Sequence, residues 1–187
     1  MRAHDVWRWL VAGAAVGMLG CDKVSFPTIP VQEQFTAALA GANEIPAVTT
    51  TASGAIRFAV SLDTVLAFRI DVAGIDTTTV ARLYSGGAGV TGGDTLATLF
   101  TGAIACLDAN LRPINEASPT CRSGYTGQLG QGQIQPSQLS KIPAGYGATP
   151  RARFDSVLAL LRSGNAYVNV HTKRNPGGEV RGQIGPQ

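Results

Sequence analysis

The sequence predicts an all-β domain: an antiparallel β-sandwich with one short helix. Three observations carry this prediction. Several short segments alternate apolar and polar residues, 23 glycines among 187 residues suit tight turns between strands, and only one segment has a helical pattern. The length suffices for one domain with a real core.

Residues 1–20 have the pattern of a secretory signal peptide rather than of the folded domain. Arg2 and Arg8 precede an apolar run, Trp9–Leu19, that is too short to span a bilayer as a helix. The sequence "MLGC" resembles the lipobox of bacterial lipoproteins, in which Cys21 would receive a diacylglyceryl group. We therefore expect a lipid-anchored, extracytoplasmic protein of the bacterial cell envelope, in either membrane. An ordinary cleaved signal is the alternative.

The two remaining cysteines, Cys106 and Cys121, form one pair once Cys21 carries lipid. They flank a polar segment, and an exported compartment is oxidising enough for a disulfide to persist. We predict a Cys106–Cys121 disulfide, with two free buried thiols as the alternative.

Residues 21–34 contain prolines and no clear period, so they are predicted to be the lipidated cysteine and a tether before a domain at 35–187. The segments 55–62 and 66–74 then alternate as a hairpin. Arg57 opposite Asp71 favours a register that pairs Phe58 with Ile70. A slip of two residues would place Arg57 opposite Arg69, and facing like charges are unfavourable.

Further strands are predicted at "VARLY", "TLATLF", "GAIAC" and the closing hairpin 166–184. The segment 107–153 is expected to be rich in loops, with "GQIQPSQL" as a short strand that leads into a helical turn. "FDSVLALLRSG" is the predicted helix, capped by Asp155 or Ser156 and ended by Gly164.

Charge and motifs exclude several functions. After removal of the signal, 13 basic residues stand against 11 acidic ones without a basic cluster, which argues against nucleic-acid binding. "GAGVTG" (87–92) matches a dinucleotide fingerprint, but a strand rather than a helix is predicted to follow it. Neither a metal-ligand cluster nor a nucleophile–base set is evident, because one histidine remains. We expect no catalytic residue, metal or cofactor.

That histidine, His171, lies in the predicted closing hairpin. Val168 and Val170 are expected to face the core, and Tyr167, Asn169 and His171 the solvent. Residues 175–178 (Asn-Pro-Gly-Gly) suit a type II turn, which would place Glu179 or Arg181 across from His171 on the solvent side. His171 is then a cross-strand hydrogen-bonding residue, with a role as ligand or base as the alternative.

Two long motifs resemble the CHRD domain, named after chordin. They are "FTAALAGANEIPAVTTTASGAIRFAV" near the start, with Leu39, Gly41, Glu44, Pro46 and Gly54 at matching positions, and "GNAYVNVHTKRNPGGEVRGQI" at the end. The resemblance covers roughly residues 35–185 and implies an antiparallel β-sandwich, immunoglobulin-like or a related Greek key, in an extracytoplasmic setting. Family members often carry two histidines where this sequence has Arg82 and Tyr84, so a role of those histidines is not expected here.

We expect a membrane-anchored, non-catalytic binding module that contacts a protein or a glycan. A metal-linked or redox protein that uses His171, or a purely architectural lipoprotein, are the rival hypotheses. The candidate surface site consists of Arg82, Tyr84, His171, Glu179 and Arg181.

Overall fold

The computed structural model describes residues 31–61, 64–104 and 124–187. The predicted signal peptide (1–20), Cys21 and the Cys106–Cys121 pair lie outside these residues. Within the described ranges, no helix is long and apolar enough to cross a membrane.

Nine strands form one sheet in the order β5-β4-β7-β8-β1-β2-β3-β6, with β9 paired to β1. Every pairing is antiparallel. The strands are β1 (Val31–Ala40), β2 (Ser53–Ser61), β3 (Val65–Ile75), β4 (Thr78–Ser85), β5 (Thr95–Ile104), β6 (Tyr125–Ile134), β7 (Ala166–Thr172), β8 (Val180–Gln183) and β9 (Gly185–Pro186). Three short 3-10 helices, η1 (Gly41–Asn43), η3 (Pro136–Lys141) and η4 (Ala144–Tyr146), and one α-helix, α1 (Pro150–Arg162), complete the order.

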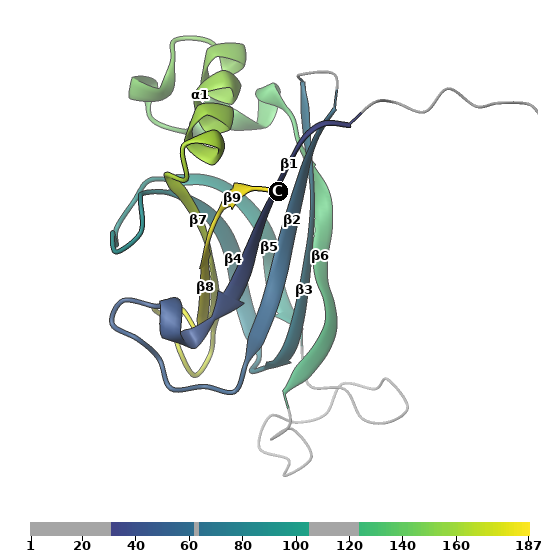
Figure 1. The fold of residues 1–187 in the computed structure, drawn as a ribbon, viewed down its shortest axis with the longest axis vertical. Helices are drawn as coiled ribbons and strands as arrows, with labels where there is room; N and C mark the ends of the chain where they lie inside the picture. Colours follow the sequence, from purple (N-terminus) through teal and green to yellow (C-terminus); the bar gives the residue numbers. More distant parts are fainter. Residues whose placement is uncertain (1–30, 62–63, 105–123) are drawn as a thin grey trace, which may run out of the picture.

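The sheet curls until its two end strands meet (Figure 1). A Cβ atom added at Gly130 of β6 would lie 3.5 Å from the carbonyl oxygen of Leu99 in β5. The sheet is therefore an almost closed, barrel-like one. The prediction of an antiparallel all-β fold with one short helix is confirmed. The finer prediction of a sandwich stays a prediction, because one curved sheet also presents two facing walls.

The core lies inside this curl. Alternate residues of each strand point inward, so apolar side chains at every second position meet in the middle. The largest fully buried ones are Phe35, Leu39, Ile56, Phe58, Leu66, Ile70, Ile75, Leu83, Leu139, Phe154, Leu161 and Ile184. They come from strands, η3 and α1, so the helical segment belongs to the same core.

The predicted register of the first hairpin is wrong by two residues. Ile56 pairs with Ile70, and Arg57 faces Arg69. The like charges are tolerated because Asp71, on the same face of β3 as Arg69, accepts hydrogen bonds from Arg69 Nε and Nη2 at 2.8 Å each. Arg57 also contributes to the lowered pKa of Asp71, after the hydrogen bond from Arg69 as the main cause. Asp71, on the same strand as Arg69, thus supplies the negative charge that the facing pair of Arg57 and Arg69 needs.

Strand β6 is longer than predicted. Only the segment from Gly132 onward was expected to be a strand, since "YTGQLGQGQI" contains little apolar alternation. The structure supplies the reason for its glycines. Gly132 pairs with Phe68 of β3, and a Cβ atom at Gly132 would lie 3.0 Å from the Phe68 ring. Glycine leaves room for an aromatic ring of the neighbouring strand.

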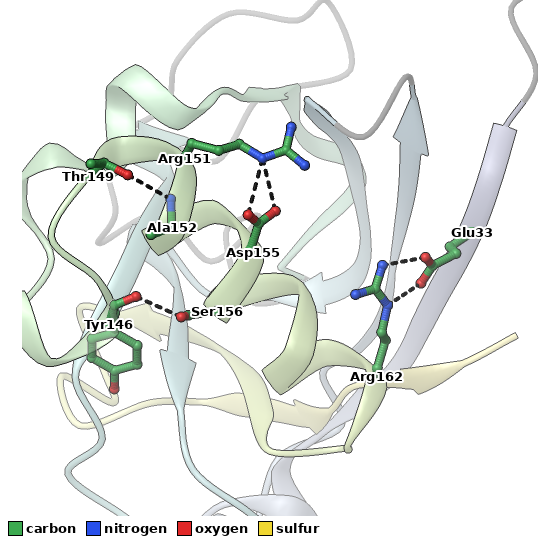
Figure 2. A network of polar contacts seen from close by, with 8 residues as sticks. All are labelled: Glu33, Tyr146, Thr149, Arg151, Ala152, Asp155, Ser156 and Arg162. Atoms are coloured by element: carbon green, nitrogen blue, oxygen red, sulfur yellow. Dashed lines mark hydrogen bonds and ion pairs between the residues drawn. The ribbon is translucent and has the colours of Figure 1, made fainter.

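Helix α1 lies across one end of the sheet (Figure 1). It begins earlier than predicted: the Thr149 side chain caps it by accepting from the Ala152 amide at 3.2 Å, and Pro150 occupies its first turn. The predicted caps have other partners, because Asp155 pairs with Arg151 and the Ser156 hydroxyl donates to the Tyr146 carbonyl (Figure 2). Gly164 follows the helix with a φ of 68°, so its predicted role at the end of the helix is confirmed.

Strand β1 begins within the segment that was predicted to be a tether. Residues 31–34 already belong to β1, so the strand begins four residues before the expected domain start at 35. Pairing with β2 and an ion pair fix this segment, rather than an apolar period. Arg162 Nε donates to Glu33 Oε2 at 2.7 Å, which ties the end of α1 to β1 (Figure 2).

Candidate functional site

The candidate site lies on the outer face of β4, β7 and β8. Cross-strand pairing places Tyr84 beside Tyr167, and Asn169 between Arg82 and Arg181. Because side chains alternate between the two faces of a strand, these residues point away from the core, and so does His171, two positions after Asn169. We call Tyr84, Tyr167, Asn169, His171 and Arg181 the covered wall.

The middle of the covered wall is buried although it faces outward, whereas Tyr84 and His171 are half-buried. Tyr167 and Arg181 are each 3 % exposed and Asn169 is 7 % exposed. The loop 41–52, which follows β1, lies beside β8 and covers this face (Figure 1). Asn43 Nδ2 donates to the Arg181 carbonyl at 3.1 Å, which fastens the loop to β8. The expectation that Arg181 lies on a solvent-exposed face is therefore wrong.

Three stacked groups form the centre of the covered wall. The guanidinium carbon of Arg181 lies 3.6 Å from the centroid of the Tyr167 ring. The Tyr84 ring stacks on Tyr167 with centroids 5.2 Å apart and an interplanar angle of 18°. An aromatic face attracts a cation more strongly when both are removed from water. The stack therefore holds the Arg181 side chain in a fixed orientation.

His171 is a hydrogen-bonded, neutral residue at one end of this wall. Its Nδ1 lies 2.9 Å from the Pro176 carbonyl oxygen, which can only accept, so Nδ1 carries the proton. Its Nε2 then accepts from the Tyr84 hydroxyl at 3.1 Å. Burial lowers the pKa of His171, and nearby Arg82 lowers it further, against the opposing effect of the Pro176 hydrogen bond.

Both ring nitrogens of His171 are thus engaged, which does not favour a ligand role. Its partners also differ from those predicted. Pairing of β7 with β8 stops at Val170–Val180, and Val80 of β4 lies across from His171 in place of Glu179 or Arg181. Within the described residues, no group of three or more His, Cys, Asp or Glu side chains could hold a metal ion.

The turn 175–178 differs from the predicted type II turn. The Gly178 amide donates to the Asn175 carbonyl at 3.0 Å, but the positive φ, 134°, occurs at Gly178 and not at Gly177. A Cβ atom at Gly178 would overlap the Asn169 amide group and lie 2.7 Å from Glu44 Oε1. Glycine is needed here because the backbone of the turn packs directly against the site.

Glu44 of the covering loop completes the site. Its Oε2 accepts from Asn169 Nδ2 at 3.1 Å, and the residue is 7 % exposed. Burial raises the pKa of Glu44 to about 7, although the Asn169 hydrogen bond and the charge of Arg181 oppose the shift. The sequence analysis did not include Glu44 among the candidate site residues. The available signal was the position of Glu44 in the opening motif.

A cavity of about 210 Å³ lies between Glu44 and the covered wall. Three buried polar atoms of its lining have no hydrogen-bond partner in the described structure: Glu44 Oε1, Asn169 Oδ1 and Arg181 Nη2. Buried polar groups without partners are rare in proteins. The lining also includes Ile45, Tyr84, Thr91, Gly92, Tyr167, His171 and Gly177. A second cavity of about 470 Å³ shares Glu44, Ile45 and Arg181 with it.

The rim of the two cavities is apolar and exposed. Ile45 and Val90 are 40 % and 46 % exposed, and they are the large hydrophobic residues that the described part of the chain exposes most. Val90 belongs to the glycine-rich turn between β4 and β5, whose neighbouring residues Gly89 and Thr91 line the cavities. As expected, this turn leads into a strand. In the folded chain the turn lies beside the two cavities.

Of the five candidate residues, the structure brings Tyr84, His171 and Arg181 to one cavity, with Arg82 beside them. Glu179 is separate. It is 3 % exposed, accepts from the Thr50 hydroxyl at 2.7 Å and lines another cavity of about 350 Å³, so its expected exposure to solvent is wrong. Glu44, Asn169 and Tyr167 are site residues that the sequence candidates did not include.

Comparison with known proteins supports the resemblance seen in the sequence motifs. The family model of the CHRD domain matches residues 35–184, a range that contains the covered wall, the loop 41–52 and the glycine-rich turn. Neither the curated proteins nor the solved structures that were compared contain a match. The chain belongs to the CHRD domain family.

Proposed function

We propose that the protein is a non-catalytic binding module, anchored by lipid at Cys21 on the outside of a bacterial membrane. It contacts a protein or a glycan through the face that carries the two cavities. Membership of the CHRD family is consistent with an extracellular interaction role. The pattern around "MLGC" supports the anchor and the location.

One observation carries the proposal. Ile45, one of the two exposed large apolar side chains of the described surface, lines a cavity that contains unpartnered buried polar atoms. The other, Val90, is next in sequence to Thr91, which also lines this cavity. Apolar contacts around a few polar groups are the usual composition of a binding site. The outer face of β3 does not combine exposed apolar side chains with unpartnered buried polar atoms among its described residues. Its polar residues Arg69 and Asp71 are exposed and paired with each other.

The geometry of His171 supports a non-catalytic role. A general base needs a free nitrogen within reach of the proton that it removes. Here Nδ1 donates to a backbone carbonyl instead of a carboxylate, and Nε2 accepts from Tyr84. Tyr84 holds His171 in place in this arrangement, and the pair braces the cavity wall.

Site-specific photocrosslinking in the host cell envelope tests the proposal. A photoreactive residue at position 45 or 90 is expected to form a discrete adduct with a partner. The matched control is position 131 on β6, where Gln131 is exposed and pairs with Arg69 of β3, away from the cavities. Adducts from all three positions alike, or from none, would contradict a binding face at the cavities.

The anchor requires a separate test. Cys21→Ser is expected to move the chain from the membrane fraction to the soluble fraction of the envelope, because the thiol that receives the lipid is lost. Unchanged membrane association of the variant would contradict lipidation at this residue and leave the binding face untouched.

A further inference from the structure

We propose that the cavity between Glu44 and Arg181 binds the carboxylate of a ligand with an apolar substituent, and that this carboxylate replaces Glu44 as the counter-charge of Arg181. The inference rests on the proposed function, because it names the chemistry of the ligand that the same face would bind. Three features of the site support it.

The first feature is the donor. Arg181 is 3 % exposed and lines both cavities, and its Nη2 has no hydrogen-bond partner in the described residues. Arginine presents a planar set of N–H groups that matches the two oxygens of a carboxylate. The Tyr167 ring fixes this donor from one side at 3.6 Å, so it is already oriented before a ligand arrives.

The second feature is the balance of charge. The charged and titratable groups around the cavity are Arg82 and Tyr84 from β4, Tyr167 and His171 from β7, Arg181 from β8, and Glu44 from the loop. His171 is neutral because burial keeps its pKa below the ordinary value. Burial also raises the pKa of Glu44 to about 7, so it is partly protonated at neutral pH. The cavity then favours an anion.

The third feature is the shape of the entrance. The floor of the cavity is buried and polar, whereas Thr91, Gly92 and Gly177 at its edge are exposed, so a ligand can enter from solvent. Ile45 and Val90 at the rim would contact whatever follows the carboxylate. A carboxylate on an apolar body, as in a free C-terminal leucine, satisfies both parts.

Protons take part in this exchange. A ligand carboxylate and an ionised Glu44 would compete for Arg181 and repel each other. Binding therefore requires a protonated Glu44, whose hydroxyl can donate to the ligand. With a pKa of about 7, the affinity falls as pH rises, by about tenfold between pH 6 and pH 8.

Calorimetric titration of the purified full-length chain tests the inference, with N-acetyl-leucine as the probe. N-acetyl-leucinamide has the same body without the charge and is expected to bind at least tenfold more weakly. Glucuronate carries a carboxylate on a polar body and is expected to bind more weakly than N-acetyl-leucine. Equal binding of the amide would overturn the carboxylate assignment, and stronger binding of glucuronate would overturn the apolar body.

Variants locate the effect. Glu44→Gln imitates the protonated side chain, so it should keep the pH 6 affinity at pH 8 as well. Arg181→Gln should weaken binding at least tenfold. Arg57→Gln also removes one positive charge, but this charge is exposed on β2, away from the cavity, so the variant should bind normally. If Arg181→Gln fails to fold, the Glu44→Gln titration and the amide still decide. An unchanged pH dependence of binding in Glu44→Gln would overturn the proposal that the ligand carboxylate replaces Glu44 as the counter-charge of Arg181.

The two proposals can fail separately. Adducts at positions 45 and 90 together with no binding of any carboxylate would overturn this inference and leave the binding module in place. Absence of both adducts and carboxylate binding would overturn both.

Discussion

Two walls of the same sheet carry polar residues on their outer faces, and their environments are opposite. On the open wall, formed by β2 and β3, the Arg69 and Asp71 side chains are 57 % and 47 % exposed. On the covered wall, Arg181 is 3 % exposed and Asn169 is 7 % exposed. Both walls alternate polar and apolar residues in sequence, so alternation alone does not separate a solvated face from a buried site.

The difference comes from what lies over each wall. The loop 41–52 is fastened over β8 by Asn43 and Thr50, whereas the described residues show no such cover over Arg69. Water satisfies polar groups on the open wall, but polar groups on the covered wall must find partners within the protein. Some of them, such as Arg181 Nη2, have none.

The largest effect is expected from Gly178→Ala, which breaks the covered wall. The new Cβ atom would overlap the Asn169 amide at a φ of 134°, where side chains are strained. We expect a loss of about 3 kcal/mol in the free energy of unfolding. Gly177→Ala is the matched control, because a Cβ there would meet nothing within 4 Å. Urea denaturation of both variants would measure this, and equal stabilities would refute the packing argument.

A smaller effect of opposite sign is expected from Glu44→Gln. The folded-state pKa of Glu44 is about 7, above the ordinary value of 4.5, so the folded protein retains a proton that the unfolded chain releases. Wild-type stability from this group is present below pH 4.5 and is lost as pH rises through 7. The variant should therefore be more stable at pH 8 by about 2 kcal/mol and nearly equal at pH 4.5.

Thermal denaturation against pH measures this difference. Glu33→Gln is the control of opposite sign, because the hydrogen bond from Arg162 lowers the pKa of Glu33 and its removal should destabilise the protein above pH 5. A constant gap between Glu44→Gln and wild type at every pH would contradict the raised pKa.

Tyr84→Phe sharpens the contrast at the edge of the covered wall. It removes the hydroxyl that donates to His171 Nε2 and stabilises the neutral ring. The pKa of His171 should rise toward its ordinary value, with a loss of about 1 kcal/mol in stability at pH 8. NMR titration of the imidazole protons would measure the pKa. Tyr125→Phe, whose hydroxyl donates to the Gln128 carbonyl, should leave His171 unchanged.

The smallest effect is expected on the open wall. Asp71→Asn leaves Arg57 and Arg69 facing each other without their counter-charge. Because these groups are exposed, the loss of stability should be close to the limit of detection and should disappear in high salt. Denaturation at low and high salt would check this. A large loss that salt does not change would mean that the open wall is less solvated than its exposure indicates.

Local pattern predicted much of the fold. Alternation located the strands of the first hairpin, β4 and β7. The leucine pattern located α1, and Gly164 marked its end. Most of β6 escaped prediction because its glycines interrupt the apolar alternation, and a Cβ atom at Gly127 or Gly130 would meet the Tyr125 or Phe100 side chain. The predicted register of the first hairpin was wrong because Asp71 pairs with Arg69 on its own strand, so the charges did not require Arg57 to face Asp71.

The candidate site was only partly predictable. His171 and Arg181 were identified from their place on a polar face, and Tyr84 from its place where family members often carry a histidine, but Glu44 and Asn169 were not identified. Glu44 is far from Asn169 in sequence, and only the folded loop brings their side chains within 3.1 Å. A buried carboxyl is therefore visible as a site only once the covering segment is in position.

The sequence by itself determined most strand segments, the presence and end of the helix, and the family, since these depend on local period, helix-ending glycine and extended motifs. The tertiary structure decided which polar face is buried and which atoms are left without partners. The physical reason is that burial depends on what covers a side chain. Here the cover is the loop 41–52, which belongs to another part of the chain than β7 and β8.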